Sequence, residues 1–140
     1  MLDKELNITD AEWRIMRVIW TLDTATSREL TNVLGESMDW KPATIKTLLR
    51  RLTDKKIIEA HKDGNKFIYT ANIAENETID LASQKFFNQV CARKVGSAIT
   101  NLIDESELTQ DDIDKIQSAL NKKVPVEDIE CNCIPGKCDC

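Results

Sequence analysis

The segment that most constrains the fold of this chain is residues 57–71, where Asp63-Gly64-Asn65 separates two short β-prone runs. A glycine between Asp and Asn favours a tight turn with positive φ, so the two runs are expected to pair as a β-hairpin. The residues before it, 40–56, repeat their apolar side chains at helical spacing. The sequence therefore predicts a helix that leads directly into a hairpin.

Two further helices are predicted upstream, at residues 10–22 and 27–36. Each follows a capping box, in which Thr9 pairs with Glu12 and Thr26 with Glu29. The three apolar stripes are expected to comprise Trp13, Met16, Ile19 and Trp20; Leu30, Val33 and Leu34; and Ile45, Leu48, Leu49 and Leu52.

Two residues mark helix ends. Gly35 suits the end of the second helix, and Pro42 suits the first turn of the third, where a missing N–H is harmless. The resulting order of helix, helix, helix and hairpin is that of a winged helix-turn-helix, whose third helix enters the DNA major groove. A small α+β domain with a solvated, charged helix would show the same pattern.

The charge of the chain is distributed unevenly. Residues 1–71 contain 12 Lys/Arg and 11 Asp/Glu, whereas residues 72–140 contain 7 and 13, for a net charge of −5. Within the first part, the segment from Lys41 to Lys66 holds eight basic and three acidic residues. An acidic protein is thus predicted to carry a local basic patch, which is compatible with binding to nucleic acid.

The second half, residues 72–123, is predicted to be a helical dimerisation region. Three short helices of this size bury too little apolar surface to form a stable monomeric domain, so pairing with a second copy is expected. Packing on the winged helix is the alternative. The residues expected at the dimer contact are Ile79, Phe86, Phe87, Ile99, Leu102, Ile103, Ile113, Ile116 and Leu120.

The tail, residues 124–140, carries two C-x-C pairs, formed by Cys131 with Cys133 and Cys138 with Cys140. In an extended chain, side chains at i and i+2 point the same way, and the intervening Pro135-Gly136 fits a type II turn that would bring the pairs together. Four thiolates suit Zn(II) or Cu(I), and in a reducing compartment a metal or redox site is favoured over a disulfide framework.

Two other residues have side chains that can ligate a metal. Cys91 is expected on a helix away from the tail, as a small buried residue rather than a ligand. His61, the only histidine, is expected to make a cross-strand or phosphate contact in the wing. A single histidine and the lack of a Gly-rich phosphate loop leave no catalytic motif, so the chain is not expected to be an enzyme.

Several stretches closely resemble the penicillinase-repressor family, which includes BlaI, MecI and the copper-responsive CopY. They are ITDAEWRIMRVIW, ATIKTLLRRLTDKK, DGNKFIYTA and, at residues 108–123, LTQDDIDKIQSALNKK. The resemblance implies a mainly α fold with a small β-hairpin wing: an N-terminal winged helix-turn-helix (residues 1–71) that binds operator DNA, then helices that hold a homodimer together.

Within that fold, the third helix and the wing supply the expected DNA contacts. Arg and Lys bond guanine edges and phosphates, whereas Thr offers its methyl group to thymine and its hydroxyl to phosphate. Base edges or nearby phosphates are assigned to Thr44, Lys46, Thr47 and Arg50, and the DNA backbone to Lys41, Arg51, Lys62 and Lys66.

The C-x-C-x4-C-x-C tail resembles that of the copper-responsive branch of the family. This implies a repressor that binds an inverted-repeat operator of copper-export genes while the four tail cysteines hold Zn(II), and that releases DNA when Cu(I), delivered by a cytosolic copper chaperone, replaces it. The antibiotic-responsive branch is cleaved at an Asn-Phe bond, where this chain has Asn101-Leu102.

A cytoplasmic location without a membrane partner is expected. Uncharged runs are far shorter than the roughly 20 residues of a membrane span, and MLDKELNITD lacks the pattern of a signal peptide. Two other functions remain compatible with the tail: a related repressor that senses another thiophilic metal or an oxidant, and a cytosolic Cu(I) thiol store or chaperone.

Overall fold

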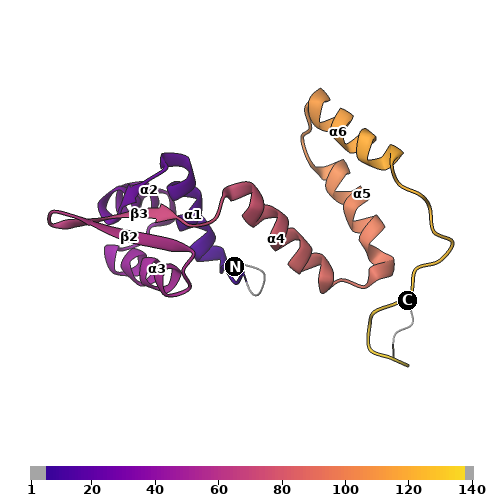
Figure 1. Ribbon diagram of the computed structural model, residues 1–140, viewed down its shortest axis with the longest axis horizontal. Coiled ribbons are helices and arrows are strands. Elements are labelled where there is room, and N and C mark those ends of the chain that lie inside the picture. Colours follow the sequence, from indigo (N-terminus) through magenta and orange to yellow (C-terminus); the bar gives the residue numbers. More distant parts are fainter. Residues whose placement is uncertain (1–5, 138–140) are drawn as a thin grey trace. The chain divides into compact units, whose positions relative to one another are not determined.

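The computed structural model describes residues 6–137 of the 140-residue chain (Figure 1). It divides into two compact units, of which the first ends at Ala82 and the second begins at Ser83. The elements are α1 (Asp10–Leu22), β1 (Ala25–Thr26), α2 (Ser27–Met38), α3 (Pro42–Asp54), β2 (Ile58–Asp63), β3 (Lys66–Ala71), α4 (Glu75–Asn88), the 3-10 helix η1 (Ala92–Lys94), α5 (Val95–Glu105) and α6 (Gln110–Asn121).

Both predicted capping boxes are present. In α1, the backbone N–H of Thr9 donates to Oε1 of Glu12 at 2.9 Å, and the N–H of Glu12 donates to Oγ1 of Thr9 at 3.1 Å. In α2, Thr26 and Glu29 make the same two bonds, at 2.9 and 3.1 Å. Each box satisfies two of the four N–H groups that a helix start leaves without helical partners, so both starts lie where the sequence predicts them.

The end of α2 differs from the prediction. The helix continues past Gly35 to Met38, and the residue that adopts the left-handed conformation after it is Asp39, with a φ of 56°. Asp tolerates this region better than most non-glycine residues. Gly35 is therefore an interior residue of α2 rather than its terminator.

The three strands form an antiparallel sheet in the order β1-β3-β2. In the hairpin, Ile58 pairs with Ala71 and Asp63 with Lys66, so only Gly64 and Asn65 form the connection. Gly64 has a φ of 65°, as predicted for this turn. Figure 1 shows the hairpin extending away from α1, α2 and α3 as a wing.

The strand β1 was not predicted. It contains only Ala25 and Thr26, which pair with Tyr69 and Ile68 of β3. Two residues are too few to show an alternation of apolar and polar side chains. They form a strand because they pair with β3, which lies more than forty positions further along the chain. This pairing attaches the wing to the connection between α1 and α2.

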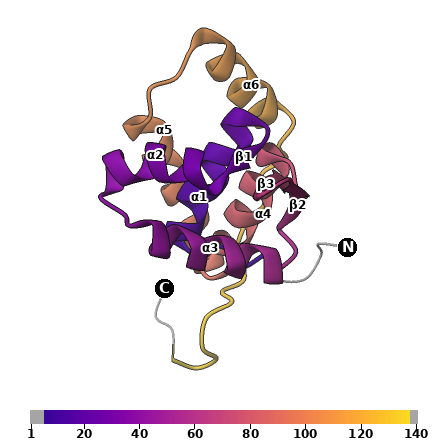
Figure 2. The same ribbon diagram turned by 90° about the vertical axis from the view of Figure 1, so that its left-hand side faces the viewer.

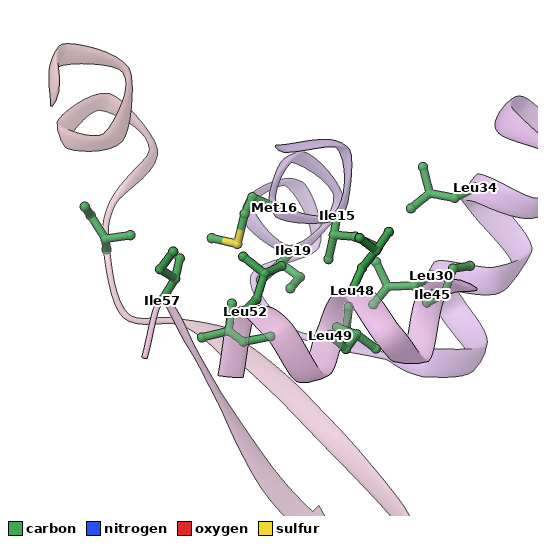
Figure 3. Close-up of a cluster of buried hydrophobic side chains, with 13 residues drawn as sticks. Ile15, Met16, Ile19, Leu30, Leu34, Ile45, Leu48, Leu49, Leu52 and Ile57 are labelled. Atoms are coloured by element: carbon green, nitrogen blue, oxygen red, sulfur yellow. The ribbon is translucent and has the colours of Figure 1, made fainter. Parts of the chain in front are cut away.

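The core of the first unit lies between the three helices and the base of the sheet (Figure 3). Among the described residues, its buried apolar side chains are Ile15, Met16, Ile19, Ala25, Leu30, Leu34, Ile45, Leu48, Leu49, Leu52, Ile57, Ile58 and Ile73. The stripe predicted for α3 is confirmed in full. In α1 the predicted Met16 and Ile19 are buried together with Glu12 and Ile15, whereas Trp13 and Trp20 are only half-buried. In α2 the predicted Leu30 and Leu34 are buried, but Val33 is exposed.

A carboxylate thus occupies a core position, and a lysine compensates it. Glu12 is 0% exposed, and its Oε1 lies 2.7 Å from Nζ of Lys55, which also donates to the carbonyl of Asn7 at 2.8 Å. Burial alone would raise the pKa of Glu12, but bonds from Lys55 and Thr9 and the charge of Lys55 together lower it below its usual value. Glu12 therefore stabilises the fold while ionised, and this contribution is lost as the pH falls through the lowered pKa.

The first unit extends into α4, beyond the predicted boundary between residues 71 and 72. Ile73 and Thr78 are buried, and Leu81 packs against the core. The indole Nε1 of Trp20 donates to the carbonyl of Ile73 at 3.0 Å. These contacts attach the start of α4 to the winged helix, so part of the segment assigned to dimerisation belongs to the first unit.

The second unit has no comparable core. It comprises the end of α4, η1, α5, α6 and the tail, and none of its described residues, 83–137, is buried. A capping box also begins α6: the N–H of Thr109 donates to Oδ2 of Asp112, and the N–H of Asp112 donates to Oγ1 of Thr109, each at 3.1 Å. Local signals set its helices, but packing within one chain covers little of their apolar surface.

Replacing Lys55 with Met is expected to lower the free energy of unfolding by about 3 kcal/mol, because Glu12 would stay buried without its cation. The double variant Glu12→Gln/Lys55→Met should recover most of this loss, since glutamine keeps an oxygen for the Thr9 amide and is uncharged. Urea denaturation of the full chain measures both. Equal losses in the two variants would mean that Lys55 acts through packing of its methylene groups instead.

Candidate functional site

The outer face of α3 is basic and exposed. The helix buries its apolar stripe against α1 and α2, which lie above it in Figure 2. The face of α3 that points away from these two helices is left in solvent. All eight residues that the sequence assigned to DNA are exposed: Lys41, Thr44, Lys46, Thr47, Arg50, Arg51, Lys62 and Lys66. Within residues 6–137, none of their cationic groups is in an ion pair.

The start of α3 also differs from the starts of its neighbours. The first turns of α1, α2 and α6 contain acidic residues, whereas the first turn of α3 contains none and is preceded by Lys41. Because no acidic side chain offsets it, the partial positive charge of the N-terminus of α3 adds to the charge of Lys41. On the same helix, the hydroxyl of Thr47 donates to the carbonyl of Ala43 at 3.0 Å, and the hydroxyl oxygen of Thr47 can still accept a bond.

The wing carries two exposed lysines next to its turn. Lys62 pairs across the hairpin with Phe67, and Lys66 pairs with Asp63. The ring of Phe67 is 49% exposed. This accessible aromatic group was not predicted, because a strand pattern in the sequence does not show which side chains stay in solvent. His61 bonds Oγ1 of Thr70 on the facing strand at 3.2 Å, as predicted.

Three cysteines among the described residues of the second unit form a cluster that was only partly expected. The Sγ atoms of Cys91, Cys131 and Cys133 all lie within 4.8 Å of one another, and those of Cys91 and Cys131 are 3.8 Å apart. The prediction that Cys91 lies on a helix away from the tail was wrong. Because α4 ends at Asn88, Cys91 lies in the non-helical connection before η1. The tail packs against this connection.

The other two predicted ligands, Cys138 and Cys140, lie outside the described residues. The turn that leads toward them is present. The N–H of Lys137 donates to the carbonyl of Ile134 at 3.0 Å, and Gly136 has a φ of 71°, as expected for Pro135-Gly136 at the centre of a type II turn.

Polar contacts hold the tail against the corner between α4 and α5. The side chain of Arg93 donates from Nε to the carbonyl of Ile129 at 2.7 Å and from a terminal nitrogen to Asp128 at 3.4 Å. The N–H of Ala92 donates to Oδ1 of Asn132 at 2.8 Å. Asn132 lies between Cys131 and Cys133 in the sequence, so this bond helps to hold both cysteines near the residues that connect α4 to α5.

The cluster suits a thiophilic ion. A Zn–S bond of about 2.3 Å places the sulfurs of a tetrahedral site about 3.8 Å apart, which is the separation of Cys91 and Cys131. The separations of Cys133 from the other two sulfurs are no larger than 4.8 Å. Sulfur donors favour Zn(II) or Cu(I) over Mg(II) or Ca(II), which take oxygen ligands.

Large apolar side chains remain uncovered along α4, α5 and α6. Phe86, Leu102 and Leu120 are each more than half exposed, at 58%, 54% and 56%. Of the remaining residues that the sequence assigned to dimerisation, Ile79, Ile99, Ile103 and Ile113 are exposed, and Phe87 and Ile116 are half-buried. The rings of Phe86 and Phe87 meet edge to face at 5.3 Å. No helix within residues 6–137 combines the length and the apolar character that crossing a membrane requires.

Comparison with known proteins gives consistent matches. Residues 8–122 match the model of the family described as penicillinase repressor. A Latilactobacillus sakei protein described as an uncharacterized 16.5 kDa protein in the ptsI 3' region is 39% identical over 142 residues, which is 100% of this chain and 97% of the relative. The methicillin resistance regulatory protein MecI of Mammaliicoccus sciuri is 32% identical over 123 residues, 88% of this chain and 100% of MecI.

Among solved structures, the monomeric form of Bacillus licheniformis BlaI in complex with the blaP half-operator is 39% identical, with a TM-score of 0.46. The match covers 51% of this chain and 87% of the BlaI chain. The family model ends at residue 122, so the cysteine-rich tail lies beyond the matched region.

Replacing Arg93 with Gln is expected to loosen the tail without affecting the first unit. Losing the charged bonds to Ile129 and Asp128 should speed amide hydrogen exchange in residues 124–133 about fivefold, corresponding to ~1 kcal/mol. Lys94→Gln removes the neighbouring positive charge and is the matched control. Equal acceleration in both variants would mean that net charge, and not the Arg93 contacts, holds the tail.

Proposed function

Because the chain belongs to the penicillinase repressor family, we propose that it is a metal-responsive transcriptional repressor that binds operator DNA as a homodimer and responds to copper through its C-terminal thiolates. The family consists of DNA-binding transcriptional repressors, not enzymes. The observation that supports DNA binding most strongly is the exposed basic face of α3, whose cations have no partner among the described residues. The location proposed for this activity is the cytoplasm.

In the proposed complex, α3 lies in the major groove and the wing follows the DNA backbone. Arg50 and Lys46 project from the middle of α3, where they reach base edges. Lys41 and the start of α3 bind phosphate at one end of the groove, while Lys62 and Lys66 bind phosphate from the wing. Side chains that are exposed and without internal partners are available for these contacts at little desolvation cost.

Homodimerisation is supported by the composition of the second unit. Its described residues form no buried core, and large apolar side chains of α4, α5 and α6 stay in solvent. Such a unit is too small to be stable by itself, whereas pairing two copies covers the apolar faces. A twofold dimer presents two recognition helices about 34 Å apart, which matches an inverted repeat on one face of DNA.

The proposed input is a thiophilic ion at the tail cysteines Cys131, Cys133, Cys138 and Cys140. When bound, Zn(II) would order these thiolates in the DNA-binding form, and Cu(I) from a cytosolic copper chaperone would compete for the same sulfurs. The chain contributes the thiolates, the Pro135-Gly136 turn that orients them, and the contacts of Arg93 and Asn132 that place them. The alternative, a cytosolic Cu(I) store or chaperone, would use the same thiols, but it would give no role to the basic face of α3.

An oxidant sensor is a second candidate, favoured by the 3.8 Å separation of the Cys91 and Cys131 sulfurs. Peroxide would convert the two thiols to a disulfide, with the peroxide reduced to two water molecules. Treating the metal-free repressor–operator complex with peroxide tests this candidate separately from copper.

Salt dependence tests DNA binding. If a dimer neutralises about 6–10 phosphates, its affinity for an inverted repeat selected from random DNA should fall about 10³–10⁵-fold between 50 and 200 mM salt. Lys66→Gln should weaken all sequences alike and reduce the slope by about 1 per protomer. Arg50→Gln should cost about 1–3 kcal/mol on the selected site alone. Arg14→Gln on α1 is the charge-matched control, and a flat salt response would exclude this mode of binding.

Copper response tests the metal input. Replacing Cys131, Cys133, Cys138 and Cys140 with Ser should leave the winged helix folded, because the first unit does not include the tail. Cu(I) should weaken operator binding by the Zn(II)-loaded wild type about 5–150-fold and leave the variant unaffected. Release of both proteins by Cu(I) would refute the assignment, and release by peroxide alone would favour the oxidant sensor.

A further inference from the structure

We propose that Cys91 is a ligand of the metal site, so that the ion joins the corner between α4 and α5 to the tail. This inference rests on the proposed thiophilic metal site, but not on DNA binding. It brings a thiolate from a different part of the chain into that site, beside Cys131 and Cys133, and it gives the bound ion a structural effect outside the tail.

The position of Cys91 is set by its own corner of the chain. Its backbone is not helical, with φ −53° and ψ 128°, and its carbonyl accepts a bond from the N–H of Lys94 at 2.8 Å. The N–H of Val90 bonds the carbonyl of Phe87 at 3.2 Å at the end of α4. A thiol held between two helical turns is placed more firmly than thiols on an irregular tail, and rigid placement is what a metal ligand requires.

The distances fit shared ligation. Cys91 lies as close to Cys131 as two sulfurs of a tetrahedral thiolate site, and Cys133 is within 4.8 Å of both. The N–H of Cys133 donates to Sγ of Cys131 at 3.3 Å, a type of bond that stabilises thiolate ligands. Within residues 6–137 no carboxylate or imidazole belongs to this group, so its donor set is entirely sulfur.

The contacts around the cluster bring the same two segments together independently of the sulfurs. Arg93 donates to Ile129 and Asp128, and Ala92 donates to Asn132, so these bonds flank Cys131 along the tail and come from the two residues that follow Cys91. The cluster is therefore a supported site and not a chance approach of one sulfur.

Ligation by Cys91 has a consequence that ligation by the tail alone lacks. An ion bound by Cys91 and Cys131 closes a loop that contains all of α5 and α6, since the two residues are 40 positions apart. These helices carry most of the uncovered apolar residues proposed to hold the dimer. Occupancy of the site would restrict how α5 and α6 move relative to the end of α4, and so the geometry of the dimer.

The test uses the purified full-length chain with Co(II) as a spectroscopic probe for Zn(II). In Cys91→Ala, which keeps a small side chain, the sulfur-to-cobalt charge-transfer absorption should decrease by the contribution of one thiolate ligand. Competition with a chelator should show at least ~10–100-fold weaker binding, since loss of even a supporting partner has that effect. Cys91→His should restore affinity with one nitrogen ligand, and Ser97→Ala is the control for an exposed substitution on α5.

A second readout does not depend on ligand counting. Binding of Zn(II) should slow amide hydrogen exchange in α5 and α6 of the wild type, and much less in Cys91→Ala. Unchanged absorption and affinity in Cys91→Ala would overturn the inference and restrict the site to the tail. A wild type that binds no Co(II) through sulfur would overturn both the inference and the proposed metal input. Loss of one sulfur in a protein whose operator binding ignores Cu(I) would support the inference and refute the proposed function.

Discussion

The amphipathic character of α3 is the constraint on which the rest of the first unit depends. Ile45, Leu48, Leu49 and Leu52 are all buried, and each contributes roughly 1.5–3 kcal/mol by leaving water. A helix that buries one stripe this completely has a fixed rotation about its axis, so its basic side chains must face outward. The ion pair of Lys55 with Glu12 then holds the end of α3 against the start of α1. Core packing and the candidate DNA surface are thus two sides of one helix.

The two units differ in how they are stabilised. The first has a closed core, a sheet whose central strand is paired on both sides, and an α4 start attached through Trp20 and Ile73. The second has capped helices, polar contacts to its tail and exposed apolar faces. Regions with few buried contacts unfold locally at a low cost in free energy, so the binding of a ligand or partner changes their stability most. A second copy and a thiophilic ion would each supply contacts that the second unit lacks within one chain.

Coupling between the ion and DNA can be no larger than the difference in ion affinity between the DNA-binding and non-binding arrangements. A site confined to the tail would make that difference small, because the tail can order in the same way in both arrangements. A site that includes Cys91 spans the helices proposed to form the dimer, so its affinity depends on their positions. By reciprocity, binding of DNA would change the affinity of the site for the ion by the same factor.

The sequence alone determined the features whose signals lie within a few residues: the capped starts of α1, α2 and α6, the stripe of α3, the turn at Gly64 and the turn at Pro135-Gly136. Only the tertiary structure decided the features that need a distant partner. These are the strand β1, the burial of Glu12 against Lys55, the attachment of α4 to the first unit, and the meeting of Cys91 with Cys131. Capping bonds and helical spacing act over three or four residues, whereas these contacts join segments 40 or more positions apart, and no local propensity encodes which segments meet.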